Sequence, residues 1–208
     1  MPHLLHIQSS PRQQRSASIE VAHAFIDAWT QRHAFASVDT LDVWTTPLPE
    51  FDGEALGAKY AALEGTPRSP AQLKVWADIE ALGQRLHHAD LIVISVPMWN
   101  FGVPYRLKHL IDAVSQKDVL FTFDERGLQG LLGGRKLVVV AARGVALGDD
   151  FPAAEFDHQT RYLQMWARMV GLNEVHTLSV EKTLFGPEAD TAARAQGRAQ
   201  AAALAATL

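Results

Sequence analysis

Two short runs of apolar, mostly β-branched residues constrain the fold of this chain more than any other feature. They are DLIVISVP at 90–97 and KLVVVAA at 136–142. Neither run alternates polar with apolar residues, and a continuous run of this kind is typical of a strand that is buried on both faces. Sheets covered on both faces are built from parallel strands, which need helical crossovers between them. We therefore expect an α/β fold.

Weaker patterns complete an alternation of strands and helices. Three further strands are expected at 3–8, 37–43 and 174–180. Helices are expected from Ser18 onward and at 73–88, 104–115, 158–171 and 187–207. The first helix has apolar residues at one-face spacing (Ala22, Phe25, Ile26 and Trp29), and Ser18 is expected to cap it. Five strands in this alternation predict a doubly wound parallel sheet.

Two segments fall outside this alternation. Residues 45–70 are rich in proline and glycine and are predicted to form a loop. In residues 119–134 the side chains first alternate along the chain as in a strand, and the sequence then becomes rich in glycine. This pattern indicates an excursion outside the main sheet, with 127–134 as a flexible connection. No repeat or linker divides the chain, so residues 1–208 are expected to form one domain.

Composition excludes several classes of function. The chain has no cysteine, so it has no disulfide, thiolate nucleophile or Cys-ligated cluster. A formal net charge of -4 does not provide the basic surface that binds nucleic acid. No apolar run reaches the length of a membrane span, and the first ten residues lack the features of a signal peptide. We expect a cytoplasmic protein with no nucleic-acid or membrane partner.

The familiar catalytic motifs are also missing. The sequence contains no HExxH, GxSxG or GxxxxGK[ST], and no GxGxxG follows the first strand. We therefore expect no metal site, no serine nucleophile and no nucleoside triphosphate chemistry. Any redox reaction would depend on a bound cofactor.

Three loops should lie together at the carboxyl edge of the sheet, where such folds bind ligands. The first, 9–18, carries four serines and two arginines before a helix. It suits either an anion site or a solvated, well-capped turn. The second, 97–104 (PMWNFGVP), offers aromatic faces and an amide, so it suits a flat heteroaromatic ring or a turn that covers the core. The third, 142–150, offers Arg143 as a cation near such a ring or as an ordinary surface residue.

The blocks PMWNFGVPYRLKHLID, RKLVVVAARG and SSPRQQRSAS, together with LFGPE at 184–188, resemble the FMN-dependent NADH-azoreductase family. The resemblance runs nearly the length of the chain. It implies a flavodoxin-like sheet of order 2-1-3-4-5 and a homodimer with FMN at its interface. Matched residue by residue, it implies these FMN contacts: Ser10, Ser16, Ala17 and Ser18 at the phosphate, Met98, Trp99, Asn100 and Phe101 against the ring, and Ala142, Arg143, Gly144 and Val145 at its pyrimidine side.

The match departs from the family at Ala142, which lacks a hydroxyl, and at Val145, which replaces a glycine. Phe121 and Phe123 resemble the aromatic residues that these enzymes lend to the substrate pocket of the partner subunit. The implied reaction is hydride transfer from NADH or NADPH through FMN to quinones or azo compounds, with no catalytic side chain of the protein's own. Two alternatives are a flavodoxin-like single-electron carrier, which is usually shorter and more acidic, and a phosphoester hydrolase, for which no carboxylate or metal cluster is visible.

Overall fold

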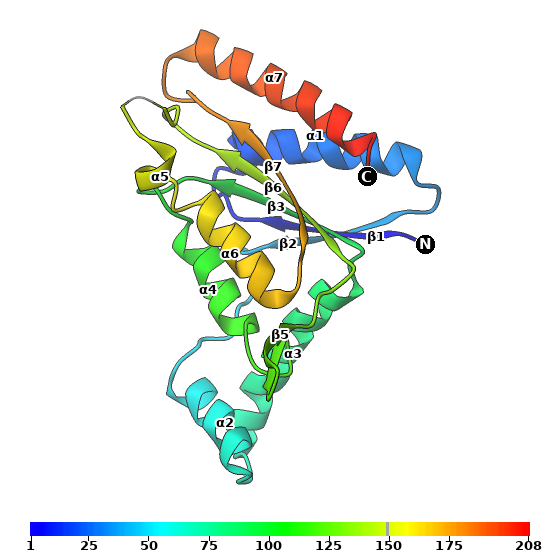
Figure 1. Cartoon of the computed structure of the whole chain (residues 1–208), viewed down its shortest axis with the longest axis vertical. Helices are drawn as coiled ribbons and strands as arrows, with labels where there is room; N and C mark the ends of the chain where they lie inside the picture. Colours follow the sequence, from blue (N-terminus) through cyan, green and yellow to red (C-terminus); the bar gives the residue numbers. More distant parts are fainter. Residues whose placement is uncertain (149) are drawn as a thin grey trace.

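A five-stranded parallel sheet forms the centre of the molecule (Figure 1). The computed structural model describes residues 1–148 and 150–208. The sheet contains β1 (His3–Gln8), β2 (Ser37–Asp42), β3 (Leu91–Pro97), β6 (Lys136–Ala142) and β7 (Glu174–Val180). Its spatial order is β2-β1-β3-β6-β7, and every neighbouring pair is parallel. The predicted α/β fold and its strand order of 2-1-3-4-5 are confirmed.

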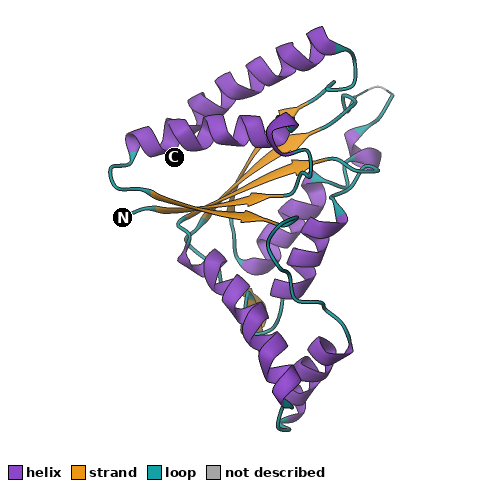
Figure 2. Cartoon of the chain, turned by 180° about the vertical axis from the view of Figure 1, so that it is seen from behind, coloured by secondary structure: helices purple, strands orange, loops and turns teal. Residues whose placement is uncertain are grey.

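Helices cover both faces of the sheet (Figures 1 and 2). Helices α1 (Ala17–Arg32) and α7 (Pro187–Ala205) pack on one face, and α3 (Pro70–His88), α4 (Tyr105–Val114) and α6 (Thr160–Val170) pack on the other. Alternate residues of β3 serve the two cores, with Val93 facing α1 and Ile92 facing the α3 side. This double burial explains why the strand sequence carries no polar alternation.

Three expectations about the elements were wrong in detail. Residues 45–70 contain the helix α2 (Gly53–Glu64), which begins at an Asp52 cap that accepts from the N–H groups of Glu54 and Ala55. The flexible connection contains a strand, β5 (Gly127–Gly130), which pairs antiparallel with β4 (Phe121–Asp124). The first helix is capped by Ser16, because Ser16 has extended backbone angles whereas Ser18 is already helical.

The β4–β5 hairpin lies outside the main sheet, as predicted, at the end where the strands begin. Leu132 N donates to Val170 O over 2.8 Å, and His87 Nε2 lies 2.6 Å from Val119 O. Val170 is the last residue of α6, which precedes β7. His87 is the second-last residue of α3, which precedes β3. The hairpin therefore sits at the amino edge of the sheet, opposite to the ends of the strands (Figure 1).

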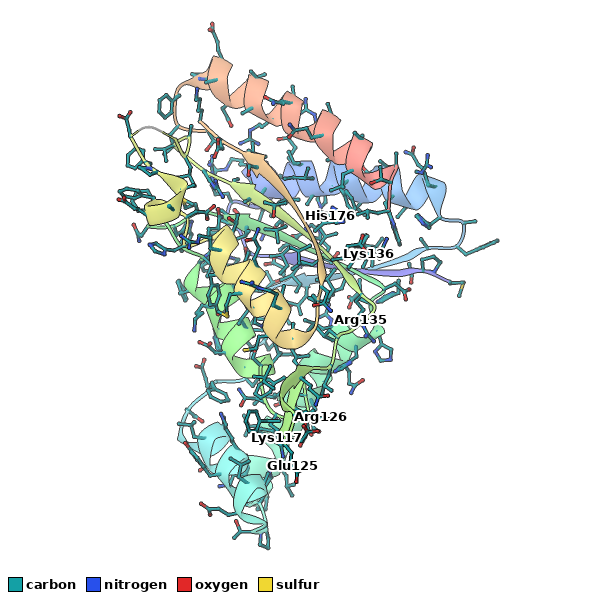
Figure 3. All side chains as sticks on the ribbon, viewed as in Figure 1. Lys117, Glu125, Arg126, Arg135, Lys136 and His176 are labelled. Carbon is teal, nitrogen blue, oxygen red and sulfur yellow. The ribbon has the colours of Figure 1, made fainter. Side chains whose placement is uncertain are left out.

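Charged side chains gather at this amino edge. Figure 3 labels five of them, Lys117, Glu125, Arg126, Arg135 and Lys136, together with His176, and the labelled residues run from the hairpin towards β7. Some of these cations have a carboxylate partner: Arg126 pairs with Asp124 at 2.6 Å, and Lys136 pairs with Glu174 at 3.3 Å. No helix of the described residues is long and apolar enough to cross a membrane.

Candidate functional site

The three loops singled out from the sequence meet at the carboxyl edge of the sheet, because β1, β3 and β6 are neighbours. Backbone hydrogen bonds join them: Ser9 N donates to Ser95 O over 3.1 Å, and Met98 N donates to Ala142 O over 2.7 Å. Arg143 N continues the ladder to Val180 O over 2.8 Å. The expected ligand loops thus form one continuous rim.

Loop 9–18 presents buried hydroxyl groups at the start of α1. Ser10, Ser16 and Ser18 are almost fully buried, and the hydroxyl oxygens of Ser16 and Ser18 are hydrogen bonded at 3.1 Å. Ala17 and Ser18 form the first turn of α1, where backbone N–H groups have no partner within the helix. The positive end of a helix dipole adds to these donors. This loop can therefore hold a phosphate.

Loop 97–104 contains a tight hairpin turn. Trp99 and Gly102 exchange both backbone hydrogen bonds, at 3.1 and 2.9 Å. The two residues between them both have positive φ, 48° at Asn100 and 65° at Phe101. These are the angles of a type I′ turn, in which glycine is the usual second residue. A phenylalanine in this conformation costs about 1–2 kcal/mol, and such strain collects at functional sites.

An aromatic cluster holds the strained turn on the side of α6. The ring of Phe101 lies 4.9 Å from that of Phe156 and 5.7 Å from that of Phe151. The carbonyl of Phe101 also accepts from His158 N over 3.1 Å. Sequence reasoning missed Phe151 and Phe156, although both lie in the polar-flanked run FPAAEFDH directly after the third loop.

The side chain of Arg143 is committed to neighbouring side chains. It is 5% exposed, and its guanidinium donates to Asp157 over 2.8 Å, to Glu181 over 3.0 Å and to Gln159 over 3.2 Å. Gln159 in turn donates to Val96 O over 3.0 Å. Two carboxylates thus neutralise the guanidinium. The same hydrogen bonds tie the ends of β3, β6 and β7 to the start of α6. What the third loop offers a ligand is chiefly its backbone.

Gly144 and Val145 keep ordinary negative φ angles, since neither is among the positive-φ residues in the described part of the chain. A side chain at Gly144 would meet Leu184, because a Cβ there would lie 2.5 Å from Leu184 Cδ1. The valine in place of a glycine at 145 therefore creates no backbone strain. Ala142 is 8% exposed and pairs with Pro97 and Val180 across the sheet.

A groove of about 1240 Å³ opens beside the turn and runs along α4. Its walls are formed by the turn, by α4 and the residues Ser115 and Gln116 that follow it, by residues 50–51 and by the first part of α6. Burial, with a smaller effect of the Asp112 carboxylate, raises the pKa of Tyr162 in this groove to about 12. Its phenol is therefore a neutral hydrogen-bond donor at physiological pH.

The structure does not bring Phe121 and Phe123 to this rim. Both lie in β4, at the opposite edge of the sheet from the three loops. Phe123 is 63% exposed, and Leu128, its partner across the hairpin, is 47% exposed. Within residues 1–148 and 150–208 no three His, Asp or Glu side chains are grouped so that they could hold a metal ion.

Comparisons with known proteins agree with this architecture. A family model described as a flavodoxin-like fold matches residues 2–205. The chain is 53% identical over 206 residues to FMN-dependent NADH:quinone oxidoreductase 2 of Pseudomonas syringae pv. tomato, covering 99% of each chain. It is 48% identical over 208 residues to FMN-dependent NADH:quinone oxidoreductase 3 of Pseudomonas fluorescens, covering 99% of this chain and 96% of the other.

Solved structures with low sequence identity share the fold. An azoreductase from Bacillus anthracis superposes with a TM-score of 0.90 at 23% identity and full coverage of both chains. An FMN-dependent NADH-azoreductase from the same species, in complex with FMN, gives a TM-score of 0.86 at 23% identity, covering 99% of this chain and all of the other. The match over nearly all of the chain and the close relatives show that this protein belongs to the flavodoxin-like fold family.

Proposed function

We propose that this chain is an FMN-dependent oxidoreductase that takes hydride from NADH and delivers it to quinones and azo compounds. The proposal depends on one observation: loop 9–18, which can hold a phosphate, and the strained aromatic turn lie on one continuous rim, and a groove opens beside that turn. The names of the relatives with about half of their residues identical point to the same reaction. We propose further that residues 1–208 form a single FMN-binding domain.

The residues of the rim fit FMN by their chemistry. Buried hydroxyl groups at a helix N-terminus suit the phosphate. A turn that carries aromatic side chains and an amide suits a flat ring with polar atoms along its edge. We assign the phosphate to Ser10, Ser16, Ala17 and Ser18. We assign the ring to Met98, Trp99, Asn100 and Phe101, and its pyrimidine edge to Ala142, Arg143, Gly144 and Val145.

Bound FMN would supply the two-electron chemistry, for which the described residues offer no metal cluster and the sequence no thiol. The protein's own residues bind and orient. The backbone of 98–101 and the Asn100 amide would orient the ring, and the groove beside Trp99 would admit the substrate. Tyr162 keeps the proton on Oη and can donate it in a hydrogen bond to an acceptor oxygen.

We also propose a cytoplasmic homodimer in which Phe121 and Phe123 of one copy reach the groove of the other. Neither ring is among the residues that line the groove of its own chain, so we assign these rings to the groove of a second copy. Exposed Phe123 and Leu128 at the hairpin support this, because large apolar side chains on a two-stranded ribbon favour contact with a partner.

Steady-state kinetics test the reaction. Protein loaded with FMN should consume NADH in the presence of a naphthoquinone, and double-reciprocal plots at several quinone concentrations should be parallel, because both substrates use one groove in turn. Protein without FMN should be inactive until FMN is added. Failure of the loaded protein to consume NADH without a separate reductase would favour a single-electron carrier.

A further inference from the structure

The last residue of β2, Asp42, and Trp44 in the turn that follows it both contact loop 9–18 through their side chains. Trp44 Nε1 donates to Ser9 O over 3.0 Å. Asp42 Oδ2 accepts from Gln13 Nε2 over 2.9 Å, so this second bond reaches the middle of the same loop. Asp42 Oδ1 accepts from Trp44 N over 2.9 Å, which ties the carboxylate to the backbone of Trp44.

The same tryptophan also contacts the aromatic loop. Its ring centroid lies 5.8 Å from that of Trp99, and Tyr105 meets it edge to face at 5.4 Å. Both distances are in the range of favourable aromatic pairs. Trp99 is the first residue of the strained turn, is 37% exposed and lines the groove. Trp44 is therefore a bridge between the two loops.

Both loops need such support. Loop 9–18 has only one short 3-10 turn, Gln13–Arg15, between β1 and α1, and Gln13 itself has a positive φ of 50°. The turn at 99–102 holds two consecutive residues at positive φ. Backbone in such conformations persists only where surrounding contacts enforce it. Phe151 and Phe156 support the turn at Phe101, and Trp44 supports it at Trp99.

We propose that Asp42 and Trp44 are positioning residues that set the phosphate loop and the aromatic turn in register for one bound flavin. The indole N–H shapes the phosphate loop through Ser9, and the indole ring places Trp99 against the isoalloxazine edge. Asp42 holds Gln13 and orients Trp44. This inference rests on the proposed function, since it requires that the rim binds FMN.

Two substitutions at one position separate the two contacts. Trp44→Phe keeps an aromatic ring beside Trp99 and removes the N–H donor. Trp44→Leu removes both. Affinities for FMN and for riboflavin, measured by quenching of flavin fluorescence with apoprotein, report separately on the phosphate loop and on the ring site, because riboflavin lacks the phosphate. Trp76→Phe, at a buried residue of α3 that belongs to none of the three loops, is the matched control for a general loss of stability.

Trp44→Phe should weaken FMN binding about tenfold and leave riboflavin binding unchanged, because one hydrogen bond to the phosphate loop is lost. Trp44→Leu should weaken both and raise KM for the quinone with little change in kcat. Trp76→Phe should lower the melting temperature without changing the ratio of the two affinities. Equal weakening of FMN and riboflavin in Trp44→Phe, or no change in either, would overturn the proposal.

A double-mutant cycle tests Asp42. Gln13→Ala and Asp42→Ala should each weaken FMN binding several-fold, and the effect of Gln13→Ala should largely disappear in the Asp42→Ala background. Fully additive effects would contradict the assigned contact. If the unaltered protein binds no FMN, the proposed function itself fails. If it binds FMN and the Trp44 and Asp42 variants bind it equally well, only the positioning role fails.

Discussion

Asn100 and Phe101 occupy the most demanding backbone of the rim. A turn with two positive φ angles favours asparagine at its first position and glycine at its second, so Asn100 suits the turn and the ring at 101 reflects a requirement other than folding. The rim also shows why residue roles escape sequence reasoning. The sequence presents Arg143 as a free cation, but its partners Asp157 and Glu181 lie 14 and 38 residues away along the chain, so only the fold shows that its charge is neutralised.

Asn100→Gly separates folding from binding at this turn. Glycine adopts positive φ freely, so the free energy of unfolding of the apoprotein should stay within about 0.5 kcal/mol of its original value. FMN affinity should fall about tenfold because the amide is lost. Calorimetry and a flavin titration measure the two quantities. Unchanged FMN affinity would remove Asn100 from the site.

Phe35→Gly is the matched control for that substitution. Phe35 also has a positive φ, 64°, but it is 82% exposed in the turn between α1 and β2. Its replacement should raise the free energy of unfolding by up to about 1 kcal/mol and leave FMN binding unchanged.

His6 should make the stability depend on pH. It is 1% exposed in β1, with Nε2 lying 3.0 Å from Ser95 Oγ. Burial, with a smaller effect of His23, lowers the pKa of His6 from 6.5 to about 3. The unfolded chain therefore binds a proton below pH 6.5 that the folded chain does not, so stability is complete above pH 6.5 and falls as the pH approaches 3.

The expected loss from His6 is about 2 kcal/mol between pH 6.5 and pH 5, from about 1.4 kcal/mol per unit. In His6→Gln the side chain can still bond Ser95 but does not titrate, so this part of the slope should vanish. Urea unfolding of both proteins at several pH values measures the difference. Identical slopes would show that His6 is not the responsible group.

Among the helices and strands, the apolar pattern predicted the buried strands correctly, whereas the types of residue at the helix starts did not predict where helices begin. The strands at 91–97 and 136–142 are visible in sequence because burial on both faces demands apolar residues throughout. Helix α2 was missed because Gly53 and Gly57 within GEALGAKYAALE suggest a loop, whereas the Asp52 cap and the contact of Gly57 with Gln72 of α3 support a helix. Ser16 and Ser18 are equally good caps by type, and only backbone angles distinguish them.

The packing of the β4–β5 hairpin against the end of α6 can be tested at Gly130. A Cβ there would lie 2.0 Å from Gly171 N and 2.1 Å from Val170 C, which are backbone atoms at the end of α6. Gly130→Ala should therefore lower the free energy of unfolding by about 1–3 kcal/mol. Gly133→Ala, where no atom lies within 4 Å, should have little effect. Equal melting temperatures for the two variants would show that the hairpin does not pack against α6.

At the scale of the whole molecule, the two edges of the sheet differ in character. The carboxyl edge carries the rim and the groove, and the amino edge carries the charged residues of Figure 3 and the hairpin with Phe123. The sequence alone could place the three loops on one edge, because parallel strand ends always coincide. It could not reveal the groove, whose walls come from segments around residues 50, 100, 110 and 160.

The proposed homodimer predicts an effect of Phe123 at a distance from its own rim. Phe123→Ala should leave the fold and FMN binding nearly unchanged, because the side chain is largely exposed, and should raise KM for the quinone several-fold. Light scattering should show a dimer for the unaltered protein. A monomer that is fully active, or a variant with unaltered KM, would contradict the assignment of Phe123 to the partner's groove.

We expect one rim to bind FMN and to expose it to two substrates in turn. Anaerobic stopped-flow mixing of the FMN-loaded protein with NADH measures this step by step. The flavin absorbance should bleach within seconds in a single turnover and return when a quinone is added after NADH is exhausted. A flavin that stays oxidised in the presence of excess NADH would show that the rim does not carry out this reaction.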